Sequence, residues 1–242
     1  MSGSRLEALQ AAEGVAPEFL VSPEMLDAVS PTGLRGGMVL GTLLDRQEAQ
    51  AVSVLRNAPT RIVLVGGMYL ARLVTLRAMA TGAWVVIATG RPNLWQPIVR
   101  AAGTGPDGRP SPVVQIRRLA PVELPPASED SPLLVVHDGG PTPQEILPPR
   151  SPWQTTLYVL PYLHPQAGTI INQADLVMLQ RLPMGQAELA ARMWRLHPQM
   201  LRQLASLKDD QVVLTRWQMW LPLRLFTTQK EQQLLGPIRR GD

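Results

Sequence analysis

The sequence predicts an α/β fold with three layers, in which a largely parallel sheet of P-loop or Rossmann-like type lies between helices and carries an antiparallel hairpin addition. Two observations support this prediction. Short, continuous apolar runs rich in β-branched residues, typical of strands buried on both faces, alternate with helical patterns. The clearest case is Arg61-Ile-Val-Leu-Val, a helical pattern over 68–80 and Trp84-Val-Val-Ile-Ala. This is a βαβ unit, whose right-handed crossover makes the two strands parallel.

The elements before the βαβ unit are shorter. Residues 1–30 carry two brief helical patterns, the second with Ser22 as N-cap and Pro23 at the first helical position. Helices this short are not stable alone, so we expect an N-terminal tail or docking helices here. A single α/β domain is then expected over 31–242. Its first element is a hairpin, predicted from the apolar runs 38–44 and 51–55, which are joined by polar residues.

The alternation of strands and helices continues after the βαβ unit. A short helix is predicted over 93–99, before a Gly/Pro-rich loop over 103–112. Proline-rich connections separate the later strands, which are predicted at 113–116, 133–136, 156–160 and 175–179. The remaining elements are amphipathic helices over 186–207 that are interrupted at Pro198, a strand pair over 212–215 and 217–226, and a helical turn over 229–235.

The composition excludes several classes of protein. The chain has 242 residues and no cysteine, so it has no disulfide framework, thiolate metal site or cysteine nucleophile. It contains no apolar run long enough for a membrane-spanning helix and no secretion signal, so we expect a cytoplasmic protein. The net charge of +4 comes from 21 arginines and two lysines, which are dispersed along the chain. Dispersed arginines do not favour nucleic acid as a partner, since such a surface normally shows a basic cluster with interleaved aromatic residues.

The Gly66-Gly67 turn follows the first strand of the βαβ unit, at the end of the sheet where ligands bind in such folds. In the register of the phosphate loop G-x-x-x-x-G-K-[ST], this chain has Ala71, Arg72 and Leu73 at the last three positions. The lysine that contacts the phosphates and the hydroxyl that binds magnesium are both replaced. We therefore do not expect ATP hydrolysis, and Gly66, Gly67 and Arg72 form a vestigial or hypothetical ligand site.

Two further polar residues follow predicted strands. Asp138 ends the strand at 133–136 in a Walker-B-like place, but Gly139 stands where a catalytic acid usually follows. The other interpretation of Asp138 is a turn residue in Asp-Gly-Gly-Pro. Arg91 could meet the 2′-phosphate of NADP, or it could be a surface residue of a Gly-Arg-Pro turn. A nucleotide- or NADP-binding enzyme or sensor that uses the Gly66-Gly67 loop is therefore the alternative function. Otherwise no cofactor is expected.

Other catalytic constellations are missing from the sequence. His137, His164 and His197 share no ligand-like spacing, so no metal site is expected. There is no G-x-S-x-G nucleophile elbow and no pair of carboxylates at helical spacing. We therefore assign no catalytic residue.

The last third of the chain is rich in tryptophan and methionine. Trp217 and Met219 lie on one face of the predicted strand over 217–226 and Trp220 lies on the other, while Trp194 belongs to the helical region before it. A marginal strand that is apolar on both faces needs a cover. Helices 186–207 would provide it if this is a core strand. Alternatively, these four residues form an aromatic and methionine-rich interface for a protein partner.

Three segments resemble the RecA-like domains of FtsK/TraD-type translocation ATPases: Val39-Leu-Gly-Thr, Arg61-Ile-Val-Leu-Val-Gly-Gly and Leu221-Pro-Leu-Arg-Leu-Phe-Thr-Thr-Gln-Lys-Glu. Four others resemble actinobacterial proteins associated with type VII (ESX-type) secretion. They are Val65-Gly-Gly-Met-Tyr-Leu-Ala-Arg, Ala88-Thr-Gly-Arg-Pro-Asn-Leu-Trp, Ser151-Pro-Trp-Gln-Thr and Ala174-Asp-Leu-Val-Met-Leu-Gln-Arg-Leu.

The resemblance covers the region from 35 to 240, and it departs from a working motor at Ala71, Arg72, Leu73 and Gly139. It implies a nucleotide-fold domain that has lost hydrolysis. Such a domain would be a non-catalytic adaptor or assembly component of a membrane-associated secretion or translocation machine. Its partners would be proteins of that machine, and it would lie in the cytoplasm or at the inner face of the membrane.

Overall fold

The computed structural model describes residues 37–46, 48–105, 107–119, 123–140, 150–216 and 219–239. These residues belong to one compact unit over Arg35–Asp242. The helical patterns predicted in 1–30 and the predicted interface residue Trp217 lie outside the described residues.

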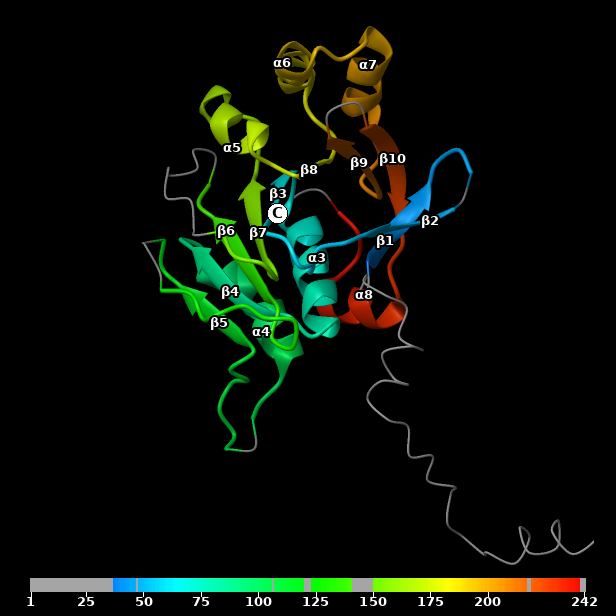
Figure 1. The fold of residues 1–242 in the computed structure, drawn as a ribbon. Helices are drawn as coiled ribbons and strands as arrows, with labels where there is room; N and C mark the ends of the chain where they lie inside the picture. Colours follow the sequence, from blue (N-terminus) through cyan, green and yellow to red (C-terminus); the bar gives the residue numbers. More distant parts are fainter. Residues whose placement is uncertain are drawn as a thin grey trace, which may run out of the picture. The chain divides into compact units, whose positions relative to one another are not determined.

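The described residues form an α/β fold around a ten-stranded sheet, in the order β2-β1-β10-β9-β8-β3-β7-β6-β4-β5 (Figure 1). The strands from β8 to β5 in this order are mutually parallel, as the βαβ pattern predicts. Their bounds are β3 (Thr60–Val65), β4 (Trp84–Thr89), β5 (Val114–Arg117), β6 (Leu133–Asp138), β7 (Gln154–Leu160) and β8 (Leu176–Leu179). The antiparallel strands at one margin are β1 (Met38–Leu43), β2 (Ala49–Val52), β9 (Gln211–Arg216) and β10 (Met219–Leu225).

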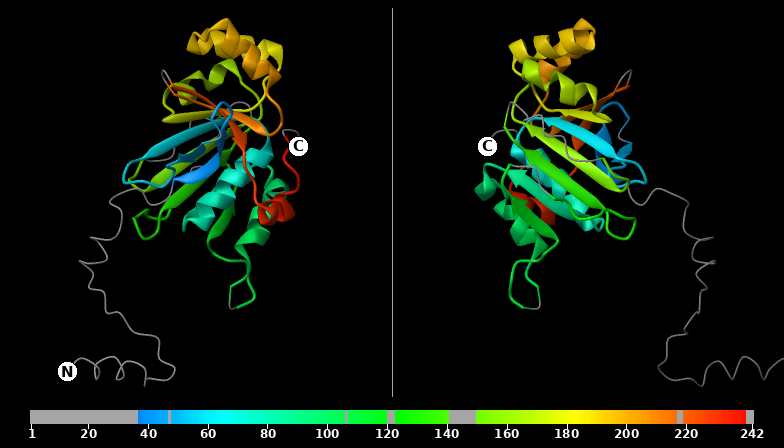
Figure 2. Two further views of the ribbon diagram at one scale, coloured as in Figure 1. Left: turned by 90° about the vertical axis from the view of Figure 1, so that its right-hand side faces the viewer. Right: turned by 60° about the vertical axis from the view of Figure 1, so that its left-hand side comes forward.

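Helices cover both faces of the sheet and complete the three layers (Figure 2). On one face, Ile62 and Leu64 of β3 share a core with α3 (Met68–Ala80), α4 (Gln96–Ala102) and α8 (Gln229–Leu235). On the other face, Val63 and Val65 share a core with α5 (Gly168–Asn172), α6 (Met184–Trp194) and α7 (Pro198–Ser206). Two short 3₁₀ segments precede α4 and α5, η1 (Pro92–Trp95) and η2 (Pro165–Ala167). None of the described helices is both long and apolar enough to cross a membrane.

The central strands are buried on both faces because their sequences are apolar at successive positions. Every residue of β3 and of β7 is buried. The helix between β3 and β4 is also buried over most of its length, from Met68 through Leu76 and at Ala78. Full burial of each large apolar side chain contributes about 1.5–3 kcal/mol relative to exposure, so this layer supplies much of the stability of the domain.

The structure adds details to the predicted elements. Strands β3 and β4 are parallel but not neighbours, because β7 and β6 lie between them. Helix α5 was not predicted. The break between the two amphipathic helices lies before Pro198, which begins α7. The last turn of α6 ends at Arg195, whose φ of 52° and ψ of 46° are left-handed.

Candidate functional site

The carboxyl ends of β3, β4, β6 and β8 lie along one edge of the sheet, where ligands bind in open α/β folds. Gly66 and Gly67 follow β3, Arg91 follows β4, and Asp138 ends β6. The parallel register places Thr89 of β4 beside Asp138. Strand β7 separates Asp138 from the Gly66-Gly67 turn, so the two features are about 10 Å apart across the sheet.

Asp138 is buried and its carboxylate has partners on both oxygens. Oδ2 accepts hydrogen bonds from the Thr89 hydroxyl at 2.8 Å and from the Trp95 Nε1–H at 3.0 Å. Oδ1 accepts from Nη2 of Arg91 at 2.5 Å. The Thr89 hydroxyl oxygen in turn accepts the backbone N–H of Arg91 at 2.8 Å. This network joins the ends of β4 and β6 to η1, so Asp138 holds the edge of the sheet together.

Arg91 and Asp138, predicted as separate candidates, form one ion pair. The guanidinium of Arg91 is turned inward to this carboxylate, although the side chain stays partly exposed. The Arg91 side chain is 40% exposed, and its Nη2 lies 3.4 Å from the sulfur of Met68, the first residue of α3. A 2′-phosphate would therefore have to compete with a charge-assisted hydrogen bond for this guanidinium.

The Gly66-Gly67 turn is closed by Gln180, the residue directly after β8. The Gln180 Oε1 accepts the backbone N–H of Gly67 at 2.8 Å, and Gln180 is buried. Gly66 lies so close to this side chain that a Cβ there would be 2.4 Å from Oε1. A side chain at position 66 would therefore force the Gln180 side chain to shift. Helix α3 begins immediately afterwards, at Met68, so the turn contains no extended loop that could wrap around a phosphate.

Arg72 lies within α3 and is buried. Its Nε donates a hydrogen bond to the carbonyl oxygen of Leu94 at 2.6 Å, which ties α3 to η1. In the structure, the residue that aligns with the phosphate-loop lysine therefore forms a contact between two helical segments.

Gln180 was not identified from the sequence as a residue of this site. Its signal was a polar side chain immediately after the strand at 175–179, at the carboxyl edge that the fold class singles out.

The predicted interface residues are divided between the two faces of the sheet. Trp194 and Trp220 are half-buried against the core that contains α6 and α7, and Met219 packs against the core that contains α3. The Trp220 Nε1–H also donates to Gln203 Oε1 of α7 at 2.9 Å. Trp220 therefore fits the interpretation of a core strand beneath the helices, while Trp194 lines a pocket.

His137, next to Asp138, does not extend the site. Its ring packs against Tyr158, with centroids 5.4 Å apart, and burial lowers the pKa of its imidazole. Within the described ranges, no three His, Cys, Asp or Glu side chains lie close enough to hold a metal ion.

In comparisons with known proteins, the sequence matches no protein-family model and no curated protein. The function is therefore argued from the site itself.

We expect Gly66→Ala to lower the free energy of unfolding by about 1–3 kcal/mol, the usual cost of overpacking a filled site. The new methyl group would overlap Gln180 Oε1. Urea denaturation of the variant would measure the loss. In a Gln180→Ala background the same substitution should cost much less, because the overlapping atoms are gone. Strictly additive effects of the two substitutions would show that Gln180 does not fill this turn.

Proposed function

We propose that this chain is a non-catalytic adaptor or assembly component of a membrane-associated protein secretion or translocation machine of the type VII kind. The observation that supports it is the closed carboxyl edge of the sheet. The groups that a nucleotide-hydrolysing relative would present to phosphate and magnesium are bonded to the protein's own side chains. The proposal also rests on the resemblance of seven segments to translocation ATPases and to ESX-associated proteins.

Phosphoryl transfer requires backbone N–H groups and a lysine at the phosphates, together with a hydroxyl and a carboxylate that hold magnesium. Here the Gly67 N–H donates to Gln180, and Asp138 accepts from Arg91, Thr89 and Trp95. A nucleotide would have to break these bonds before it gained its own. One observation favours the alternative, a nucleotide- or NADP-binding enzyme or sensor: Nε2 of Gln180 is buried and has no hydrogen-bond partner among the described residues.

An adaptor needs contact surface as well as a stable core. Near the closed edge, Tyr162 is 40% exposed and Met184 is 53% exposed. The segments that carry them are joined by a hydrogen bond of 3.1 Å from the Leu163 N–H to Gln186 Oε1. Exposed apolar side chains held on a fixed framework suit contact with a protein partner.

Two experiments test this proposal. Purified full chain with MgATP should release phosphate no faster than buffer, and Arg72→Ala should not change that result. Turnover that disappears in Arg72→Ala but persists in the exposed control Arg109→Ala would contradict a non-catalytic role. In cells, the tagged chain should sediment with membranes only when the secretion machine is present. The same distribution with and without the machine would contradict the assignment to it.

A further inference from the structure

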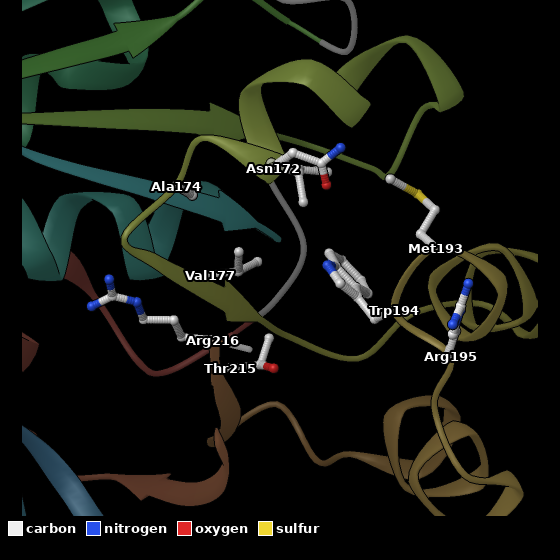
Figure 3. A pocket seen from close by; sticks show the side chains of 9 residues that line it. Asn172, Ala174, Val177, Met193, Trp194, Arg195, Thr215 and Arg216 are labelled. Carbon is white, nitrogen blue, oxygen red and sulfur yellow. The ribbon is translucent and has the colours of Figure 1, made fainter. Parts of the chain in front are cut away.

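A pocket of about 410 Å³ lies at the opposite edge of the sheet from the closed site, between α5, β8, the end of α6 and the end of β9 (Figure 3). Strand β9 runs antiparallel to β8, with Thr215 opposite Val177, so the end of β9 lies at the amino end of β8. The size is within the range of small-molecule sites, about 300–1,000 Å³. Its wall is mostly apolar and includes Ile171, Val177, Met193 and Trp194, with Asn172 and Thr215 as polar members.

Trp194 is the principal apolar feature of this pocket. Its indole projects from the end of α6 into the space between α6, Asn172 and Val177 (Figure 3). The side chain is half-buried, and it has no hydrogen-bond partner among the described residues. An indole placed in this way offers a flat apolar surface and one N–H donor to a ligand.

Arg216 lines the pocket, with its guanidinium pointing away from Trp194 (Figure 3). Its guanidinium lies 3.8 Å from Oδ1 of Asp175, and the guanidinium of Arg56 lies 3.7 Å from the same oxygen. One carboxylate is therefore shared by two cations at distances longer than a hydrogen bond. Ion pairs of this exposed kind contribute only about 0–1 kcal/mol, so Arg216 can leave Asp175 at little cost.

Two more arginines bond Gln173, which lies two residues before Asp175. Nη1 of Arg61 donates to Gln173 Oε1 at 2.5 Å, and Nη2 of Arg150 donates to the Gln173 carbonyl oxygen at 3.3 Å. Burial lowers the pKa of the Arg61 guanidinium, and the charge of Arg150 lowers it further. Two guanidinium groups, of Arg56 and Arg216, thus lie at the Asp175 carboxylate, and two more, of Arg61 and Arg150, are bonded to Gln173 nearby.

The pocket borders the residues that these arginines contact. Gln173 and Asp175 flank Ala174, which lines the pocket, and Arg216 lines it as well. Arg195 lines the far side, beyond Trp194, and has no ion-pair partner in the described part of the chain (Figure 3). Its left-handed backbone, where glycine is usual, costs on the order of 1 kcal/mol. An apolar space with an arginine at either end, one of which turns from Asp175 to face it, is complementary to an anion with an apolar body.

We propose that this pocket binds a small anionic amphiphile, with its aromatic or short alkyl body against Trp194 and a carboxylate or phosphate group at Arg216. The proposal is independent of the adaptor function, since it rests on the other edge of the sheet. Asn172 of α5 lines the same pocket, and Arg56, which shares Asp175 with Arg216, adds a second cation at the Arg216 end.

The test uses octyl phosphate, octanoate and octanol as probes, titrated calorimetrically into the full chain at low ionic strength. Both anions should bind saturably, at least roughly tenfold tighter than octanol, because a hydrogen bond to a charged group contributes about 1.5–3 kcal/mol. The relative affinity of octyl phosphate and octanoate identifies the preferred anionic group. Inorganic phosphate alone should bind at least tenfold more weakly than octyl phosphate.

Arg216→Gln should weaken both anions roughly tenfold and leave octanol unchanged, because it removes the guanidinium and its charge and leaves the apolar wall in place. The matched control is Arg224→Gln on the neighbouring strand β10, an exposed arginine 3.6 Å from Asp210. It should change neither affinity. Equal binding of octanol and the anions, equal binding of inorganic and octyl phosphate, or no effect of Arg216→Gln would overturn the proposal. So would binding of an acidic peptide with one tryptophan when neither octyl anion binds, since the pocket would then be a peptide-docking site.

Discussion

Asp138→Asn is expected to lower the free energy of unfolding by about 3 kcal/mol, the lower end of the range for removing one partner of a buried ion pair. The lower end applies because Arg91 is 40% exposed and can turn to water. The amide group of asparagine would also present N–H donors to Arg91, or to the Thr89 hydroxyl and the Trp95 indole, which are themselves donors. At least one buried bond is therefore lost with no replacement.

Urea denaturation of the variant and of a matched control would measure this effect. The control is Asp107→Asn, whose carboxylate is 61% exposed and 3.7 Å from Arg109. It should stay within about 0.5 kcal/mol of the parent, as surface substitutions usually do. If Asp138→Asn were as stable as Asp107→Asn, Asp138 would not have the structural role assigned here, and its carboxylate would be available for a ligand.

Arg77→Met is expected to cost about 3–5 kcal/mol, because it breaks a buried ion pair and leaves its partner uncompensated. Arg77 pairs with Glu231 at 2.6 Å and 2.9 Å, and both side chains are only 12–13% exposed. Its guanidinium also donates to the carbonyl oxygens of Val39, Leu40 and Phe226. One side chain of α3 therefore joins β1, the end of β10 and α8. Methionine keeps the apolar stem and removes all of these bonds.

The same pair predicts a pH dependence. Burial raises the pKa of Glu231, but the hydrogen bonds from Arg77 and Thr228 outweigh burial, and the net pKa lies below the ordinary value of 4.5. A carboxyl group whose pKa is lowered by folding stabilises the protein above its ordinary pKa, and this contribution is lost as the pH falls through the lowered value. The difference in stability between the parent and Arg77→Met should therefore shrink below about pH 4.5.

Arg100→Met is the control for this experiment, since Arg100 is an exposed arginine near the end of α4. It should change neither stability nor its dependence on pH. A difference between parent and Arg77→Met that stays constant from pH 7 to pH 3 would contradict the assigned role of the ion pair.

The strands of this fold could be predicted because their signal is local. The runs at 61–65 and 156–160 are apolar at successive positions, and the structure buries every residue of β3 and β7. Their order in the sheet could not be predicted, since pairing between distant strands leaves no local pattern. Helix α5 was missed for a related reason. Its five residues, Gly168–Asn172, are too few to show a helical period.

The candidate site was predictable as a set of positions but not as a set of bonds. Fold class alone pointed to Gly66, Gly67, Arg91 and Asp138, because each follows or ends a strand at the same edge. That Arg91 turns inward to Asp138 depends on the tertiary placement of η1 and β6. Arg72 illustrates the opposite case. Motif alignment placed it at a phosphate, whereas its position in α3 brings it to the Leu94 carbonyl.

The central claim is that the carboxyl edge of the sheet is closed by the protein's own bonds and takes no nucleotide. Calorimetric titration of the full chain with ATP, GTP, NADP and NAD, each at millimolar concentration with magnesium, tests it most directly. The account predicts no saturable heat for any of the four. Saturable binding of one of them, weakened at least tenfold by Arg91→Gln but not by the exposed control Arg109→Gln, would contradict it.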